Sequence, residues 1–173
     1  LAEHFSANGV TVLRCDLPFR QKHPHGPPSP ASAVHDQQGL RRAAELLKSQ
    51  VSGRLFLGGS SYGGRQASLL LASDRCAGGL LLLSYPLHPP GKASQLRTAH
   101  FPKLNVPTLF VSGTRDPFGS PEELVSAVQA IPASHRIVHI DGAGHDLWPK
   151  AKRAEIPALV WEGFFNFLIG ADR

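Results

Sequence analysis

The sequence predicts an α/β fold in which a mostly parallel sheet is covered by helices on both faces. Apolar runs typical of strands alternate along the chain with segments of helical periodicity. The runs are almost continuously apolar, as expected of strands buried on both faces, and turns rich in Gly, Pro and Asp separate them. Since 173 residues suffice for one hydrophobic core, we expect a single domain over residues 1–173.

The first third of the chain has four expected elements. Residues 1–8 have helical spacing and precede Gly9, a residue that ends helices. Val10–Cys15 is apolar and β-branched, which predicts a buried strand. The proline-rich segment 19–32 predicts a loop, because proline neither donates to a ladder nor continues a helix. Residues 35–50 return to a helical pattern.

The alternation becomes regular beyond residue 50. Further strands are expected at 54–59, 79–84, 107–113 and 135–140, and further helices at 64–73, 122–130 and 156–169. In such a sheet, ligands bind outside the carboxyl ends of the strands. We therefore expect functional residues in the loops that follow the strands.

Composition excludes several functional classes. Eighteen basic against thirteen acidic residues give a net charge of +5, but the basic residues are scattered, which does not favour a nucleic-acid partner. No apolar run approaches the ~20 residues that cross a bilayer, so we expect no membrane partner and a cytoplasmic protein. Cys15 and Cys76 are isolated, as expected of buried free thiols in a reducing compartment. No His or Cys spacing suggests a metal, and we expect no cofactor.

A G-x-S-x-G pattern runs from Gly59 to Gly63 with Ser61 at its centre, whereas the adjacent Ser60 fits no such frame. An expected strand precedes it and an expected helix follows it. This is the context of a nucleophile elbow, a sharp strained turn at which the flanking glycines avoid collisions with neighbouring backbone. The pattern therefore predicts Ser61 as a nucleophile. The start of the helix would offer the N–H of Tyr62 to an oxyanion.

A serine needs a general base and a third group that orients the base. Asp116 follows the expected strand 107–113, and His145 lies in a glycine-flanked loop after the strand 135–140. Asp141 and Asp146 are alternatives to Asp116, but a near neighbour in a turning loop usually points away from the ring that it would orient. We expect Ser61, Asp116 and His145 to meet, and the other histidines to be structural or surface residues.

The motifs VLRCDLPFR, GGSSYGGRQAS, LLLLSYPLHPPGK, VPTLFVSGTRDPFG and GAGHDL, in this order, resemble the alpha/beta-hydrolase superfamily. The resemblance is to its small lidless, dienelactone-hydrolase-like branch. It implies Ser61 as nucleophile, His145 as base, Asp116 as orienting acid and Tyr62 as an oxyanion-hole donor. The implied enzyme is a carboxylesterase-like serine hydrolase that cleaves a small acyl substrate through an acyl-enzyme.

The expected site is open, because the segment between the strands 79–84 and 107–113 is too short for a helical cap domain. We expect Tyr85 and Phe118 to contact the substrate. Leu87 and Trp148 either line the same rim or simply pack under the loops. Two alternatives to hydrolysis remain: acyl transfer to an alcohol or thiol, and a catalytically silent hydrolase-fold scaffold or protein-binding module.

The sequence also departs from the family pattern. Family members have a strand and an oxyanion loop ahead of the helix in which this chain begins. That strand would lie between those expected at 10–15 and 54–59, so a gap in the sheet is expected there. We accordingly expect the natural protein to be longer by one or more βα units, with the second oxyanion-hole donor outside this sequence.

Overall fold

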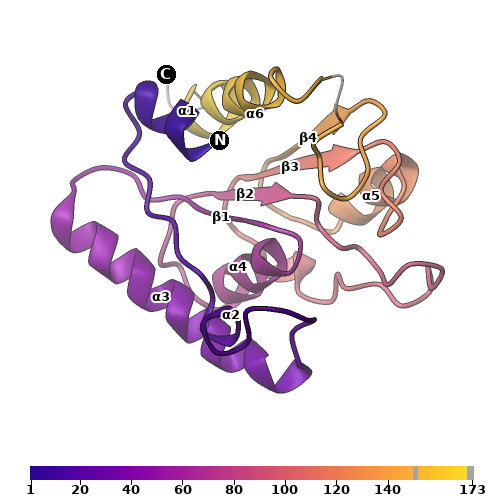
Figure 1. Cartoon of the computed structure of the whole chain (residues 1–173), viewed down its shortest axis with the longest axis horizontal. Helices are drawn as coiled ribbons and strands as arrows, with labels where there is room; N and C mark the ends of the chain where they lie inside the picture. Colours follow the sequence, from indigo (N-terminus) through magenta and orange to yellow (C-terminus); the bar gives the residue numbers. More distant parts are fainter. Residues whose placement is uncertain (150–151, 171–173) are drawn as a thin grey trace.

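The computed structural model describes residues 1–149 and 152–170. Within these residues the core is a four-stranded parallel sheet in the order β1-β2-β3-β4 (Figure 1). The strands are β1 (Leu57–Ser60), β2 (Leu80–Leu83), β3 (Thr108–Gly113) and β4 (His135–Ile140). Each strand pairs in parallel with the next along the chain. The expected α/β fold with a parallel sheet is confirmed.

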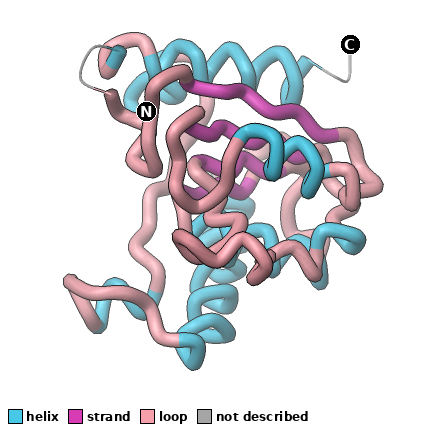
Figure 2. Tube along the Cα trace, turned by 90° about the vertical axis from the view of Figure 1, so that its right-hand side faces the viewer, coloured by secondary structure: helices cyan, strands magenta, loops and turns pink. Residues whose placement is uncertain are grey.

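Helices cover both faces of the sheet, as Figures 1 and 2 show. One face packs against α3 (Ala33–Gln50), α4 (Tyr62–Ser73) and α5 (Pro121–Val128). The other packs against α1 (Ala2–Ala7) and α6 (Ile156–Phe164), which continues into the π-helical turn η4 (Phe165–Ile169). Among the described residues, no helix combines the length and the apolar character needed to cross a bilayer.

The two central strands separate two hydrophobic cores. In β2, Leu80 and Leu82 face the core under α3, α4 and α5, whereas Leu81 faces the core under α1 and α6. In β3, Phe110 lies in the first core and Leu109 in the second. Successive side chains of a strand point to opposite faces, so a strand covered on both sides must be apolar at every position. This explains the unbroken leucine run of β2.

The expected elements beyond residue 33 are observed with shifted ends. The strand expected at 54–59 is β1, which begins at Leu57, and the helix expected at 64–73 is α4, which begins at Tyr62. The helix expected at 122–130 is α5. Its start is fixed by a capping box, in which the Ser120 side chain accepts from the Glu123 backbone and the Glu123 side chain accepts from the Ser120 backbone.

The proline-rich segment is not a loop throughout. Residues Pro18–Lys22 form the short helix α2, and Pro30–Ser32 form the 3-10 turn η1. Pro18 occupies the first turn of α2. A backbone N–H at this position would have no acceptor within the helix, so proline loses no hydrogen bond there, and its fixed φ suits a helix. A further 3-10 turn, η2, spans Phe101–Lys103.

The prediction of a strand at Val10–Cys15 is wrong. The segment joins no strand in the described structure, and Val12 and Leu13 are 36% and 41% exposed. It runs from α1 to α2 across the direction of β1 rather than alongside it (Figure 1). A cavity of about 770 Å³ lies against residues 9–14 and the free edge of β1. No described strand lies between this segment and β1, so the segment has no strand to pair with. Cys15, which we expected to be buried, is exposed, and Cys76 is half-buried.

Leu109→Ala tests the core under α6. Leu109 is fully buried, so the variant loses both apolar burial and packing, and we expect a loss of about 2–5 kcal/mol in the free energy of unfolding. The control is Val125→Ala on α5, where the side chain is 48% exposed and a change within about 0.5 kcal/mol is expected. Urea denaturation followed by circular dichroism measures both, and equal midpoints for the two variants would contradict the assigned core.

Candidate active site

Ser61 stands at the junction between β1 and α4. It is the N-cap residue of α4, with φ 50° and ψ −120°. A positive φ is unfavourable for a residue with a side chain and persists only where the surroundings impose it. One such constraint is the hydrogen bond from Ser61 N to Leu83 O, at 2.8 Å. The turn places the Ser61 hydroxyl at the carboxyl edge of the sheet, as the elbow pattern predicts.

The glycines of the motif allow the strand and the helix to approach closely. A Cβ at Gly59 would lie 2.6 Å from the carbonyl carbon of Gly63, and one at Gly64 would lie 2.6 Å from the Gly59 carbonyl oxygen. A Cβ at Gly63 would meet nothing within 4 Å. The expectation for Gly59 is thus confirmed, but the second required glycine is Gly64, because the residue one position further along α4 faces back onto the strand.

Ser61, His145 and Asp116 come together at this edge. His145 Nε2 lies 2.7 Å from Ser61 Oγ. On the other side of the ring, His145 Nδ1 lies 3.0 and 2.9 Å from the two carboxylate oxygens of Asp116. All three distances are those of hydrogen bonds. Since a carboxylate only accepts, Nδ1 carries the ring proton of the neutral imidazole, and Nε2 is left to accept from the serine hydroxyl.

Asp116 follows β3 and is held in place by its own loop. Its side chain is 1% exposed, and its Oδ1 also accepts a hydrogen bond from Phe118 N, at 2.9 Å. The Phe118 ring packs on the His145 ring with a centroid distance of 4.1 Å. The imidazole is therefore fixed by the carboxylate at one edge and by an aromatic ring on one face, while 24% of its side chain remains accessible.

The loops that carry Asp116 and His145 are joined by hydrogen bonds from backbone N–H groups. Gly142 N donates to Thr114 Oγ1, and Arg115 N donates to Ala143 O, each at 2.9 Å. The Ala143 carbonyl occupies the place that a side chain at Gly113 would need. This close contact ties the loop after β3 to the loop after β4. The separation of Asp116 and His145 is therefore set by the pairing of the two strands.

The two alternative acids point elsewhere. Asp141 accepts from Thr114 Oγ1 at 3.4 Å, and Asp146 accepts from Trp148 N at 3.3 Å. Both are exposed. In the described part of the chain, no group of three His, Cys, Asp or Glu side chains gathers as such residues do around a metal ion.

Tyr62 begins α4, so its N–H is one of the first backbone donors of the helix, which have no helical acceptor. Its side chain is anchored, because the hydroxyl donates to Asp36 Oδ2 at 2.8 Å. Asp36 is fully buried, and its Oδ1 accepts from Phe19 N at 2.9 Å. Burial and the neighbouring Asp36 raise the pKa of Tyr62. Asp36 could not be identified from the sequence, since no motif relates it to Tyr62.

Tyr85 does not lie at the rim where we expected it. It is 3% exposed and packs against Phe101 and Phe110 in the core, and its hydroxyl donates to Arg97 O at 2.6 Å. The phenol ring is therefore covered by apolar side chains and its polar tip is occupied. Leu87 is likewise in the core at 1% exposure, whereas Phe118 is half-buried at the site.

His88 connects the loop after β2 to the loop that carries Phe118. Its backbone N–H donates to Phe118 O at 3.0 Å, and its ring lies 2.8 Å from Pro89 O and 3.2 Å from Glu123 Oε2. The Pro89 carbonyl raises the pKa of His88, burial opposes this, and the Glu123 carboxylate adds to the increase. The neighbouring Ser120 N–H, and then His88, lower the pKa of Glu123.

Comparisons with known proteins agree with this architecture. A family model described as an alpha/beta hydrolase domain matches residues 1–162. An alpha-beta serine hydrolase homologue from Coxiella burnetii superposes with a TM-score of 0.59 at 22% identity, covering 80% of this chain. Dienelactone hydrolase from Anabaena variabilis superposes with a TM-score of 0.62 at 19% identity, covering 86% of this chain. At these identities the two structures show the shared fold.

The chain is shorter than these relatives. It spans 62% of the Coxiella chain and 65% of the Anabaena chain. Over 63 residues, or 36% of its length, it is 41% identical to polyketide synthase ThaQ from Burkholderia thailandensis, of which this segment is 3%.

Alanine should lower stability at Gly64 but not at Gly63. Gly64→Ala places a methyl group against the Gly59 carbonyl oxygen, and we expect a loss of about 1–3 kcal/mol in the free energy of unfolding. Gly63→Ala has open space within α4, so we expect unchanged or up to about 1 kcal/mol higher stability. Chemical denaturation of both variants checks this, and a destabilising Gly63→Ala with a neutral Gly64→Ala would refute the assignment.

The contact between His88 and Glu123 should make stability depend on pH. Because the pKa of His88 is raised by folding, its contribution is complete below about pH 6.5 and is lost as the pH rises through the folded value. Glu123→Gln removes the partner. The difference in free energy of unfolding between wild type and Glu123→Gln should therefore be larger at about pH 6 than at about pH 8.

The matched control for this pH dependence is Glu45→Gln, an exposed position on α3. The difference in free energy of unfolding between wild type and Glu45→Gln should be the same at both pH values. Urea titrations at each pH measure the three proteins. If the Glu123→Gln and Glu45→Gln differences change equally, the assignment of the pH dependence to His88 is wrong.

Proposed function

We propose that this chain, which belongs to the alpha/beta hydrolase domain family, is a serine hydrolase. It cleaves a small carboxylic ester through an acyl-enzyme. One observation carries the proposal: Ser61 Oγ and His145 Nε2 lie 2.7 Å apart, with a buried carboxylate on the far side of the ring. In this order of groups, the imidazole can accept the proton of the serine hydroxyl, and the carboxylate orients the imidazole and stabilises its positive charge.

In the first half of the proposed reaction, Ser61 Oγ attacks the ester carbonyl carbon while its proton passes to His145 Nε2. The ring then carries a positive charge, which the Asp116 carboxylate stabilises through Nδ1–H. Collapse of the tetrahedral intermediate breaks the bond to the alcohol oxygen. His145 returns the proton to that oxygen, so that the alcohol leaves and the acyl group remains on Ser61 as an ester.

In the second half, water takes the place of the alcohol. His145 Nε2 accepts a proton from water as its oxygen attacks the acyl carbon, and then returns the proton to Ser61 Oγ as the acid is released. The burial of Asp116 strengthens its interaction with the imidazolium, because water does not screen it. The accessible part of His145 leaves a path by which water can approach.

The developing oxyanion would be stabilised at the start of α4. The Tyr62 N–H belongs to the first helical turn, whose donors and partial positive charge favour an anion. The hydrogen bond between the Tyr62 hydroxyl and Asp36 limits movement of this residue. We infer that Tyr62 supplies one oxyanion-hole donor and that Phe118, which packs on the imidazole, contacts the acyl group.

A fluorophosphonate probe tests the nucleophile. Such probes phosphonylate activated serines, so we expect labelling of the wild-type protein and none of Ser61→Ala. The matched control is Ser60→Ala, an exposed serine one position earlier, which should label normally. Asp116→Asn should reduce the rate of hydrolysis of a short p-nitrophenyl ester about 10⁴-fold, because the ring would no longer be held in the required tautomer.

Two results would overturn the proposal. Labelling that persists in Ser61→Ala would place the nucleophile elsewhere. A folded wild-type protein that neither labels nor hydrolyses esters would favour a catalytically silent scaffold. Product analysis in the presence of an added alcohol or thiol separates hydrolysis from acyl transfer, because only transfer yields a new ester or thioester.

A further inference from the structure

A cavity of about 310 Å³ lies between α4 and the segment that follows β2. Four basic side chains line it: Arg65, Arg97, His100 and Lys103. We call this cavity the basic pocket. Its remaining lining is apolar, and no Asp or Glu among the described residues contributes to it. Residues that are scattered in the sequence therefore concentrate charge of one sign in one hollow.

The described part of the chain supplies no counterion to the charge in the basic pocket. Within residues 1–149 and 152–170, no carboxylate lies within 4.0 Å of Arg65, Arg97 or Lys103. Arg65 Nε is buried and has no hydrogen-bond partner in this part of the chain. Burial, and then the charge of Arg65, lower the pKa of Arg97. Cations withdrawn from water without a partner are unfavourable, and a bound anion would remove this penalty.

His100 forms a fixed wall of the pocket rather than a fourth charge. Its Nε2 lies 2.8 Å from Ser68 Oγ, and Ser68 Oγ donates to Arg65 O at 2.8 Å. Because the Ser68 hydroxyl donates its proton to Arg65 O, Ser68 Oγ accepts a hydrogen bond from His100 Nε2–H. Burial, and then Arg65, lower the pKa of His100 to about 4. At neutral pH the positive charge of the pocket comes from the two arginines and Lys103.

The basic pocket shares the helix α4 with the proposed nucleophile. Ser61 is the N-cap residue of α4. Arg65 lies in the first turn of the same helix, and its backbone N–H donates to Ser61 O at 3.0 Å. The backbone of Arg65 is therefore about one helical turn from Ser61.

We propose that the basic pocket binds a small oxyanion, a carboxylate or phosphate group. Arginine is suited to this role, because its planar fork of N–H donors matches two oxygens of such a group. Arg65 and Arg97 would bind the oxyanion, and Lys103 at the exposed edge would add attraction. The anion is either free in solution or part of the acyl substrate. The second source rests on the proposed function, whereas the binding itself does not.

Isothermal titration calorimetry with inorganic phosphate and with succinate tests the binding without any need for turnover. We expect saturable binding of at least one of them by the 173-residue chain. Arg97→Gln should weaken it about tenfold, the effect of one lost charge-assisted hydrogen bond. The Ser61→Ala protein should bind as wild type does, since the serine does not line the pocket.

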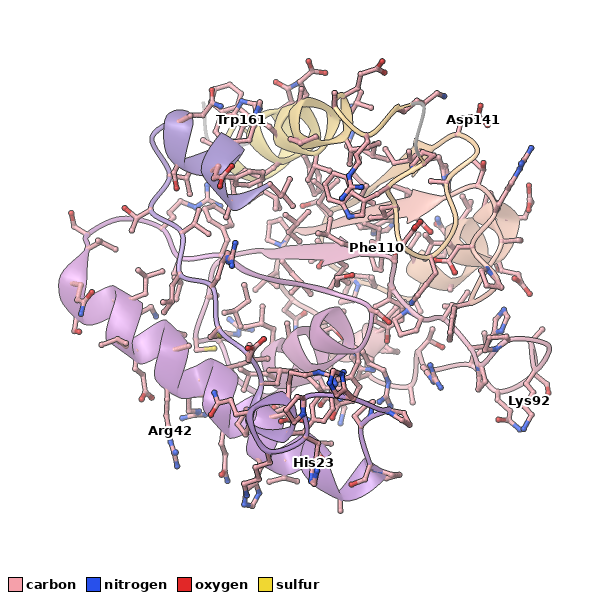
Figure 3. The ribbon with its side chains drawn as sticks, viewed as in Figure 1. His23, Arg42, Lys92, Phe110, Asp141 and Trp161 are labelled. Atoms are coloured by element: carbon pink, nitrogen blue, oxygen red, sulfur yellow. The ribbon has the colours of Figure 1, made fainter. Side chains whose placement is uncertain are left out.

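The matched control is Arg42→Gln. Arg42 extends from α3 into solvent (Figure 3), so this variant makes the same change in net charge outside the pocket. Arg65→Gln is informative only if the variant folds, because Arg65 Nε is buried. Lys103 is exposed, so Lys103→Gln serves as a second pocket variant. Absence of saturable binding, or equal weakening by Arg42→Gln and Arg97→Gln, would overturn the proposal.

Two esters distinguish the sources of the anion. Mono-p-nitrophenyl succinate and p-nitrophenyl butyrate have acyl chains of the same length, and only the first carries a carboxylate. If the substrate supplies the anion, wild type prefers the acidic ester, and the ratio of the two kcat/KM values falls about tenfold in Arg97→Gln but not in Arg42→Gln. Saturable binding without such a preference indicates a free anion. Binding without hydrolysis of either ester refutes the proposed function and leaves the anion site intact.

Discussion

The site depends on the close approach of β1 and α4 at Ser61. The two elements can meet only because neither Gly59 nor Gly64 carries a side chain, and the turn between them forces Ser61 to a positive φ. The hydrogen bond from Ser61 N to Leu83 O extends the pairing of β1 with β2 to this residue. The strained conformation is therefore maintained by the sheet on one side and by the helix on the other. Without it, the hydroxyl would not project from the edge of the sheet.

The same principle places Asp116 and His145 beside each other. Asp116 and His145 follow adjacent strands, β3 and β4, and their loops are joined where Arg115 N meets Ala143 O. Parallel pairing brings the carboxyl ends of neighbouring strands to one edge, so the distance between the loops follows from the register. The imidazole is held by the carboxylate and the Phe118 ring.

Charge is paired differently at the candidate active site and in the basic pocket. At the candidate active site, the buried Asp116 carboxylate is satisfied by the imidazole and a backbone N–H. In the basic pocket, Arg65 and Arg97 lie close enough for one to lower the pKa of the other. Clustered cations for which the described residues supply no carboxylate retain the capacity to attract an anion.

The sequence by itself determined the fold class, the order of the elements beyond residue 33 and the position of Ser61 at the turn between β1 and α4, because strand burial and the tight turn impose local patterns that any such chain must obey. Its failures have a common cause. Val10–Cys15 has the composition of a strand but no neighbour to pair with, and Tyr85 belongs to the core although its loop position suggested the rim. Contacts between distant segments leave no local pattern. Only the tertiary structure could decide that Asp36 holds Tyr62, that Gly64 rather than Gly63 is sterically required, and that scattered basic residues converge in one pocket.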